Sequence, residues 1–161
     1  MTAPDALDPD DLPPRPRVAG CELCQGNGGL LVARFDAFRV IRAEDALHPA
    51  FYRVIWNEHV AEWTDLAPAD RSCIMQAVAK VESVLRTQLK PAKINLASLG
   101  NLVPHLHWHV IARFTDDAHW PQPVWAPVQR QTGDAAARLA VPLQALDAEV
   151  VKALAALPSA A

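Results

Sequence analysis

The feature that most constrains this chain is an alternation of histidines with bulky apolar residues near residue 107. His105, His107 and His109 are separated by a leucine and a tryptophan. Successive side chains of a β-strand point to opposite faces, so the histidines would line one face and the apolar residues would enter a core. A helix would scatter the same histidines around its axis. The pattern therefore predicts a strand over residues 105–114, which we expect to be the fifth and central strand of a sheet.

Three imidazoles on one strand face are hard to explain by packing alone. A single histidine in a strand is ordinarily a surface residue or a satisfied core residue. Aligned imidazoles cost desolvation or mutual repulsion when they are charged, and they contribute little packing. Such clusters usually mark metal or catalytic sites. We therefore take this face as the candidate site, and His48 and His119 lie outside the pattern.

Hydrophobic periodicity outlines the remaining elements. Pro68 suits the first position of a helix, Pro91 stops one, and the apolar residues between them recur at spacings of three and four. This predicts one long helix over residues 68–89. We further expect strands at residues 30–33, 38–41, 51–56 and 93–97, a short helix at 60–66 and a last amphipathic helix between residues 143 and 157.

Strands on both sides of one long helix indicate an α+β fold with a five-stranded, mainly antiparallel sheet and a C-terminal helix. A chain of 161 residues is most simply one domain. The Pro- and Asp-rich residues 1–17 predict a mobile leader, residues 18–130 the domain itself, and residues 131–161 a C-terminal helical extension.

Bulk properties exclude several functions. A formal net charge of −3 argues against broad electrostatic binding of a nucleic acid polymer. No apolar run is long enough to span a membrane, and the first residues lack the basic and apolar regions of a signal peptide. We therefore expect a cytoplasmic protein whose three cysteines need not form a disulfide.

Two of these cysteines, Cys21 and Cys24, have the C-x-x-C spacing of half a zinc site. The same spacing fits two small buried residues beside a turn. A closed structural zinc site needs two further ligands, which the spacing alone does not identify.

Residues 105–111, His-Leu-His-Trp-His-Val-Ile, match the signature of the histidine-triad family, and the lead-in 100–104 resembles that family's. Weaker matches extend the resemblance from about Cys21 to Arg113. Within the family, the chain resembles the zinc-containing bacterial branch that includes diadenosine tetraphosphate hydrolases. The resemblance implies a five-stranded antiparallel sheet and a homodimer.

The resemblance also completes the metal site. In zinc-bearing members the remaining ligands occupy the positions of His59 and His105. With Cys21 and Cys24 they would make a structural zinc site of two thiolates and two imidazoles, which would attach the N-terminal segment to the sheet.

The same resemblance assigns the chemistry to His107. This residue would attack the α-phosphorus of a nucleotide and form a covalent nucleotidyl-histidine, which water then hydrolyses. Imidazole is a competent nucleophile near neutral pH. A backbone carbonyl would hold the second ring nitrogen of His107, and His109 would donate a hydrogen bond to the phosphoryl oxygen. Some transferase relatives carry glutamine at the third position, so His109 favours hydrolysis.

Asn95, Ser98 and Asn101 are the candidate phosphate- or nucleotide-binding residues. Asn101 stands where the family usually has a glutamine, which is one methylene longer. Asparagine and serine also favour loops and turns for structural reasons. One departure affects the leaving-group step: Phe51 stands where the family often has a histidine that adjoins the triad.

Two tryptophans lie in a Pro-rich segment after the triad. Trp120 and Trp125 could stack on a base or pack an interface. Packing is the more common role of large aromatic side chains.

Three functions remain open. The leading hypothesis is a nucleotide hydrolase or nucleotidyl transferase acting on dinucleoside polyphosphates, nucleoside phosphoramidates or similar conjugates. A second is a metal-dependent hydrolase that uses His105, His107 and His109 as ligands of a catalytic metal. A third is a zinc-stabilised nucleotide-binding regulator with little turnover. The expected partners are a nucleotide and a second copy of the chain.

Overall fold

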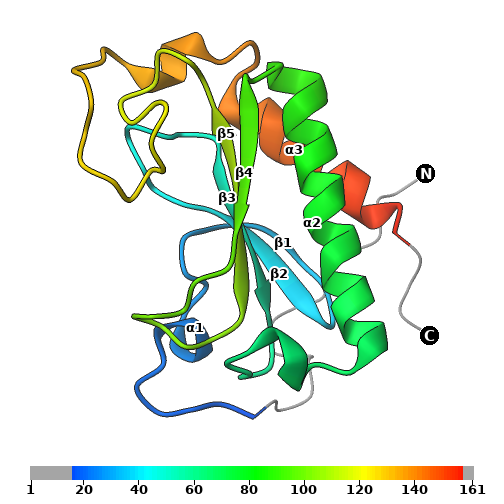
Figure 1. The fold of residues 1–161 in the computed structure, drawn as a ribbon. Helices are drawn as coiled ribbons and strands as arrows, with labels where there is room; N and C mark the ends of the chain where they lie inside the picture. Colours follow the sequence, from blue (N-terminus) through cyan, green and yellow to red (C-terminus); the bar gives the residue numbers. More distant parts are fainter. Residues whose placement is uncertain (1–15, 158–161) are drawn as a thin grey trace.

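The computed structural model describes residues 16–157, and its centre is a five-stranded sheet in the order β1-β2-β3-β5-β4 (Figure 1). Every neighbouring pair of strands is antiparallel. The strands are β1 (Leu30–Arg34), β2 (Phe38–Arg42), β3 (Phe51–Trp56), β4 (Lys93–Ala97) and β5 (His107–Arg113). The predicted α+β fold is confirmed. Residues 1–15 of the expected leader lie outside the described residues.

The alternation that predicted β5 is present, but the strand differs from the prediction at its start and in its place. It begins at His107, and it lies between β3 and β4, so β3 is the central strand. His105 precedes the strand because its N–H donates to the carbonyl of Val103, 2.8 Å away, in a tight turn. Leu106 and Val110 enter the core beneath the helices, as the period of two requires.

The long helix α2 (Pro68–Leu89) has the predicted bounds. Pro68 occupies its first turn, and Lys90 ends it in the left-handed conformation with φ 49°. Its buried stripe packs against β3 and β5 and consists of Ile74, Ala77, Val78, Val81, Leu85 and Leu89. The helix expected at residues 60–66 is instead a single 3₁₀ turn, η2 (Trp63–Asp65), because the segment is too short to close an α-helical ladder.

The last helix, α3 (Leu143–Ala155), joins the same core. It lies with α2 on one side of the sheet (Figure 1). Asp147 on α3 accepts hydrogen bonds from the hydroxyl of Tyr52, at 2.6 Å, and from Arg42. The extension is therefore packed onto the strands rather than detached from them. A further 3₁₀ turn, η3 (Ala135–Arg138), precedes it.

The opposite face of the sheet carries the histidines. A short helix, α1 (Glu22–Gln25), packs there through Leu23 against Ile41 and Ile55 (Figure 1). None of the helices among residues 16–157 has the length and apolar character needed to cross a membrane.

Candidate metal centre and catalytic face

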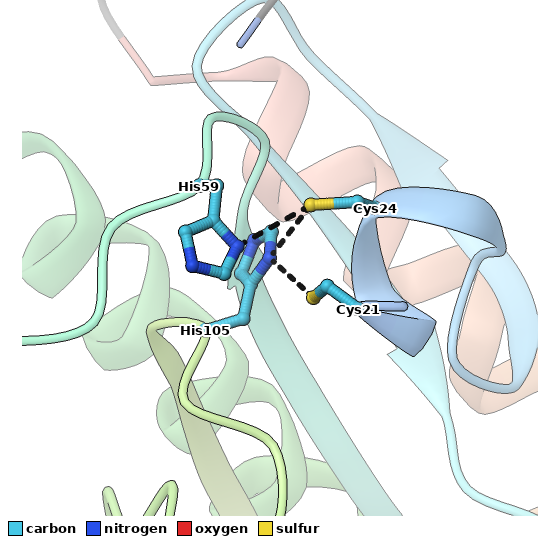
Figure 2. Close-up of side chains that lie close together, drawn as sticks. All are labelled: Cys21, Cys24, His59 and His105. Carbon is cyan, nitrogen blue, oxygen red and sulfur yellow. Dashed lines mark hydrogen bonds between the residues drawn. The ribbon is translucent and has the colours of Figure 1, made fainter. Parts of the chain in front are cut away.

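Four potential metal ligands from three segments of the chain meet at one end of the sheet (Figure 2). Cys21 caps the start of α1 and Cys24 lies within it, His59 follows β3, and His105 precedes β5. Their ligand atoms all lie within 4.8 Å of one another. Two thiols and two imidazoles therefore converge on one point, although their segments are far apart in the sequence.

The separations between these atoms suit a tetrahedral metal ion. The Nδ1 atom of His105 lies 3.4 Å from the sulfur of Cys21 and 3.5 Å from that of Cys24, and the Nδ1 atom of His59 lies 3.4 Å from Cys24. Zinc bonds of about 2.3 Å to sulfur and 2.0 Å to nitrogen separate a sulfur from a nitrogen by about 3.5 Å at the tetrahedral angle. The donor set and its spacing fit a closed structural site.

The orientation of His105 is fixed from behind. Its Nε2–H donates to the carbonyl of Trp56, 2.7 Å away, so Nδ1 carries the free lone pair that faces the thiols. Hydrogen bonding of the second ring nitrogen is the usual way in which a protein orients a metal-binding histidine. Burial lowers the pKa of His105, which favours the neutral form that a ligand requires.

A buried arginine holds the cysteine segment against the sheet, and the sequence did not reveal this. Arg39 on β2 donates to the carbonyls of Leu23, Gly26 and Asn27 at 2.7 to 3.2 Å. Burial, with a contribution from Arg34, lowers the pKa of Arg39 to about 10, so the side chain remains a cation at neutral pH. It positions the thiols through the backbone of their loop.

His107 lies at the start of β5, and its two ring nitrogens have different surroundings. Its Nδ1–H donates to the carbonyl of His105 at 2.6 Å, which leaves Nε2 with a free lone pair. Burial lowers the pKa of His107, and repulsion from Arg53 adds to the effect while the bond to the carbonyl opposes it. At neutral pH the ring is therefore an uncharged imidazole with one nitrogen available for attack.

Three aromatic rings surround the imidazole of His109, each in an edge-to-face arrangement. The distance between ring centroids is 4.8 Å to His107, 5.1 Å to Trp125 and 5.4 Å to Phe51. Burial first, and then repulsion from His107 and Arg53, lowers the pKa of His109 to about 3. Its Nδ1 atom is buried without a hydrogen-bond partner in the described part of the chain. At neutral pH His109 can offer a hydrogen bond but carries no charge.

The three candidate phosphate-binding residues have different surroundings. The Asn95 side-chain oxygen on β4 accepts a hydrogen bond from Arg113 at 2.6 Å. The Ser98 hydroxyl donates to the carbonyl of His107 at 2.9 Å, so it supports the strand that carries this histidine. Asn101 is exposed in the loop before β5.

The side chain of Trp125 is half exposed, so one part of the indole packs against the protein and the other part faces solvent. It lines a cleft of about 500 Å³ together with the residues of β4, Pro121 and Pro123. Its edge contact with His109 links this cleft to the histidine face.

An α+β chain with a five-stranded antiparallel sheet, a histidine face and an adjoining Cys₂His₂ cluster has the features of proteins in which a candidate metal site lies beside a histidine-lined surface. Comparison with known families narrows this class. The HIT domain matches residues 27–116, more than half of the chain, and the chain belongs to the HIT-domain family. This family comprises nucleotide-binding hydrolases and transferases.

Solved structures agree with this assignment. A histidine triad protein from Bradyrhizobium japonicum is 29% identical and has a TM-score of 0.65 over 80% of this chain and 92% of its own. One from Sinorhizobium meliloti is 24% identical, with a TM-score of 0.63 over 78% and 90% of the two chains. A Zn-bound family protein from Mycobacterium smegmatis is 18% identical and shares the fold, with a TM-score of 0.54 over 84% and 94%. The comparison with curated proteins found no match.

Proposed function

We propose that the protein is a nucleotide hydrolase or nucleotidyl transferase that acts at the α-phosphate of a nucleotidyl conjugate through a covalent intermediate on His107. Candidate substrates are dinucleoside polyphosphates, nucleoside phosphoramidates and similar conjugates. The observation that carries the proposal is the 2.6 Å bond from His107 Nδ1 to the carbonyl of His105. This bond fixes the tautomer in which Nε2 is the nucleophile.

The reaction has two displacements. The Nε2 lone pair attacks the α-phosphorus, a P–N bond forms, and the bond from phosphorus to the leaving group breaks with its electrons on the departing atom. His109 donates its N–H to a phosphoryl oxygen while negative charge develops there. Water then attacks the same phosphorus, the P–N bond breaks, and its electrons return to Nε2 of His107. The nucleotide takes the oxygen of the water, and the proton leaves to solvent.

We propose further that the ion of the Cys₂His₂ cluster is zinc and that its role is structural. When bound, it supplies a cross-link between the segments of Cys21, Cys24, His59 and His105. The alternative in which the three triad histidines share a catalytic metal has no support here. His105 directs Nδ1 toward the thiols, and the cluster found among residues 16–157 contains neither His107 nor His109.

We also propose a cytoplasmic homodimer. Reduced thiols remain available to a metal in the cytoplasm. No strand among residues 16–157 pairs with the outer edge of β4, where Leu96 is 40% exposed, and such edges favour pairing with another chain. Sedimentation analysis of the purified protein tests this assembly.

The test of the function is covalent capture. The wild-type protein is mixed with a panel of adenylyl compounds, quenched in milliseconds to seconds and weighed intact. We expect an adenylyl adduct on the wild type and none on His107→Ala. Loss of a covalent nucleophile costs on the order of 10⁴- to 10⁶-fold in turnover. His107→Asn should still bind nucleotide and keep its metal.

Metal content and thermal stability of both variants serve as controls. Turnover by His107→Ala within about tenfold of wild type, far short of the loss expected for a nucleophile, would sink the covalent mechanism. Tight nucleotide binding with no adduct and no turnover across the panel would instead identify a regulator.

A further inference from the structure

Arg53 is a cation on the histidine face that the proposed reaction has not used. It lies on β3 directly opposite His109 in the strand register. Residues that face each other on antiparallel strands share one face of the sheet, with their Cβ atoms about 5 Å apart. Its guanidinium lies 5.3 Å from the centre of the Phe51 ring, which itself contacts His109. The positive charge of Arg53 therefore adjoins the reacting histidines.

The guanidinium has hydrogen-bonding capacity to spare. Its one hydrogen bond goes from Nη1 to the carbonyl of Gly28 at 3.2 Å, and its Nε is buried without a partner in the described part of the chain. No carboxylate among residues 16–157 pairs with it within 4.0 Å, and Asp45 attracts it only from a longer range. A half-buried, unpaired arginine beside a phosphate-reacting group is suited to bind a phosphate.

Support of the Gly28 loop does not explain this arrangement. Arg39 already holds that loop with bonds to three of its carbonyls. Arg53 adds one bond, at the long end of the normal range. Repulsion from Arg53 also reaches both His107 and His109, so its charge acts at the reacting centre.

The rings at this point of the face provide no acid that could protonate a leaving group. Phe51 is hydrocarbon, the indole N–H of Trp125 is not acidic, and the pKa of His109, about 3, leaves its own ring neutral. A departing amine must take up a proton as its bond to phosphorus breaks, whereas a departing phosphate leaves as a stable anion. A cation beside neutral rings favours the second kind of leaving group.

We infer that Arg53 binds the phosphate chain of the leaving group, and that the substrate of this site is therefore a phosphoanhydride rather than a phosphoramidate. This inference rests on the proposed function. As Nε2 of His107 forms the P–N bond, the bond from the α-phosphorus to the bridging oxygen breaks. The electron pair stays on that oxygen, and the charge of Arg53 offsets the new negative charge.

The experiment compares two leaving groups on one nucleotidyl group. Full-length, metal-loaded protein is assayed with diadenosine tetraphosphate, which releases ATP, and with adenosine 5′-phosphoramidate, which releases ammonia. We expect the wild type to prefer the tetraphosphate. Arg53→Gln should lower kcat/KM for the tetraphosphate about 100-fold, but that for the phosphoramidate by less than about fivefold. Arg53→Lys keeps the positive charge but loses the paired N–H donors of the guanidinium. Its kcat/KM for the tetraphosphate should therefore lie between those of Arg53→Gln and the wild type.

The control is Arg86→Gln on α2, whose side chain is 70% exposed, with the same change of charge and no expected effect. Equal losses on both substrates in a folded Arg53→Gln variant, or no loss on the tetraphosphate, would overturn the inference. So would a wild-type preference for the phosphoramidate. If Arg53→Gln does not fold, the same comparison is made with Arg53→Lys, and a loss confined to the tetraphosphate supports the inference while equal losses overturn it.

A binding measurement separates this inference from the proposed function. Inorganic triphosphate is titrated into the wild type and into Arg53→Gln by calorimetry. We expect the Kd of the variant to be at least roughly tenfold larger than that of the wild type. Equal affinities would remove Arg53 from phosphate binding even if the adduct on His107 forms. A missing adduct with unequal affinities would reject the covalent function but keep the anion site.

Discussion

At the scale of single residues, backbone carbonyls decide the chemistry of the triad. The carbonyl of Trp56 orients His105 toward the thiols, and the carbonyl of His105 orients His107 for attack. One histidine thus positions the next through its own main chain. The proposed division of labour, with His105 as metal ligand and His107 as nucleophile, depends on these two bonds, because each fixes which ring nitrogen keeps its lone pair.

The hydrogen bond from Ser98 to the carbonyl of His107 is a third backbone contact of the triad, and substitution of Ser98 tests its role. Its hydroxyl donates to the carbonyl of His107, so Ser98→Ala should lower the free energy of unfolding by about 1 kcal/mol. We expect KM for a nucleotidyl substrate to change less than kcat, because the bond supports the strand rather than the nucleotide. Urea unfolding and steady-state kinetics measure the two effects.

The matched control for this change is Ser72→Ala, an exposed position on α2, which should not weaken the protein. A large rise in KM for Ser98→Ala, with unchanged stability, would show that the hydroxyl binds the phosphate instead.

At the scale of elements, the Cys₂His₂ cluster brings together short segments of the chain that bury little apolar surface of their own. Helix α1 has only four residues and buries one of them, Leu23. The loop after β3 and the turn before β5 contribute the two histidines. A metal ion would therefore add to the hydrogen bonds of Arg39 in holding this end of the sheet together, since site binding energy contributes to folding.

We predict one zinc per chain and a lower thermal stability once it is lost. Removing zinc by a strong chelator, or replacing Cys24 by serine, should lower Tm by several degrees. Each 1 kcal/mol of lost stability lowers Tm by about 2 to 4 °C in a chain of this size. Catalysis should persist in the fraction that stays folded. Elemental analysis and differential scanning calorimetry follow both quantities.

Cys73→Ser is the matched control, because Cys73 lies on α2 outside the cluster. A Cys24→Ser variant that keeps its Tm but loses turnover would transfer the metal from a structural to a catalytic role.

At the scale of the whole molecule, a second pair of histidines connects the segment between β2 and β3 to the segment after β5. The Nε2 atom of His48 and the Nδ1 atom of His119 are 2.8 Å apart, and both side chains are buried. Asp117 beside them is bound by Arg113 at 2.7 Å. This cluster joins the two loops that flank Phe51 and Trp125, so it supports the wall of the histidine face.

We predict that acid weakens this connection. Burial lowers the pKa of His48, opposed by Asp117 and Asp45 and assisted by Arg113 and His119. Its folded pKa thus lies below the unfolded value of about 6.5, so the unfolded chain binds more protons in the window between them. The stability is complete above pH 6.5 and is lost as pH falls below it. The slope is at most about 1.4 kcal/mol per pH unit for each such histidine.

Urea unfolding at pH 7, 6 and 5 measures this slope. His48→Gln, which keeps a hydrogen-bonding side chain but does not titrate in this window, should flatten it. An unchanged slope in that variant would place the acid sensitivity elsewhere, for example in the triad histidines, whose pKa values burial also lowers.

The sequence by itself determined the five strands, the two longer helices and the C-x-x-C half of the candidate metal site, and only the family resemblance added His59 and His105 as ligands. Pro68 and Pro91 bounded α2, and the alternation around His107 identified β5, because side-chain period follows from local backbone geometry. Only the tertiary structure decided that His105 lies in a turn before the strand and that Arg53 lies opposite His109. Strand register brings Arg53 to His109, and loop packing brings the ring of His105 to the carbonyl of Trp56, and both pairs lie dozens of positions apart where no local pattern connects them.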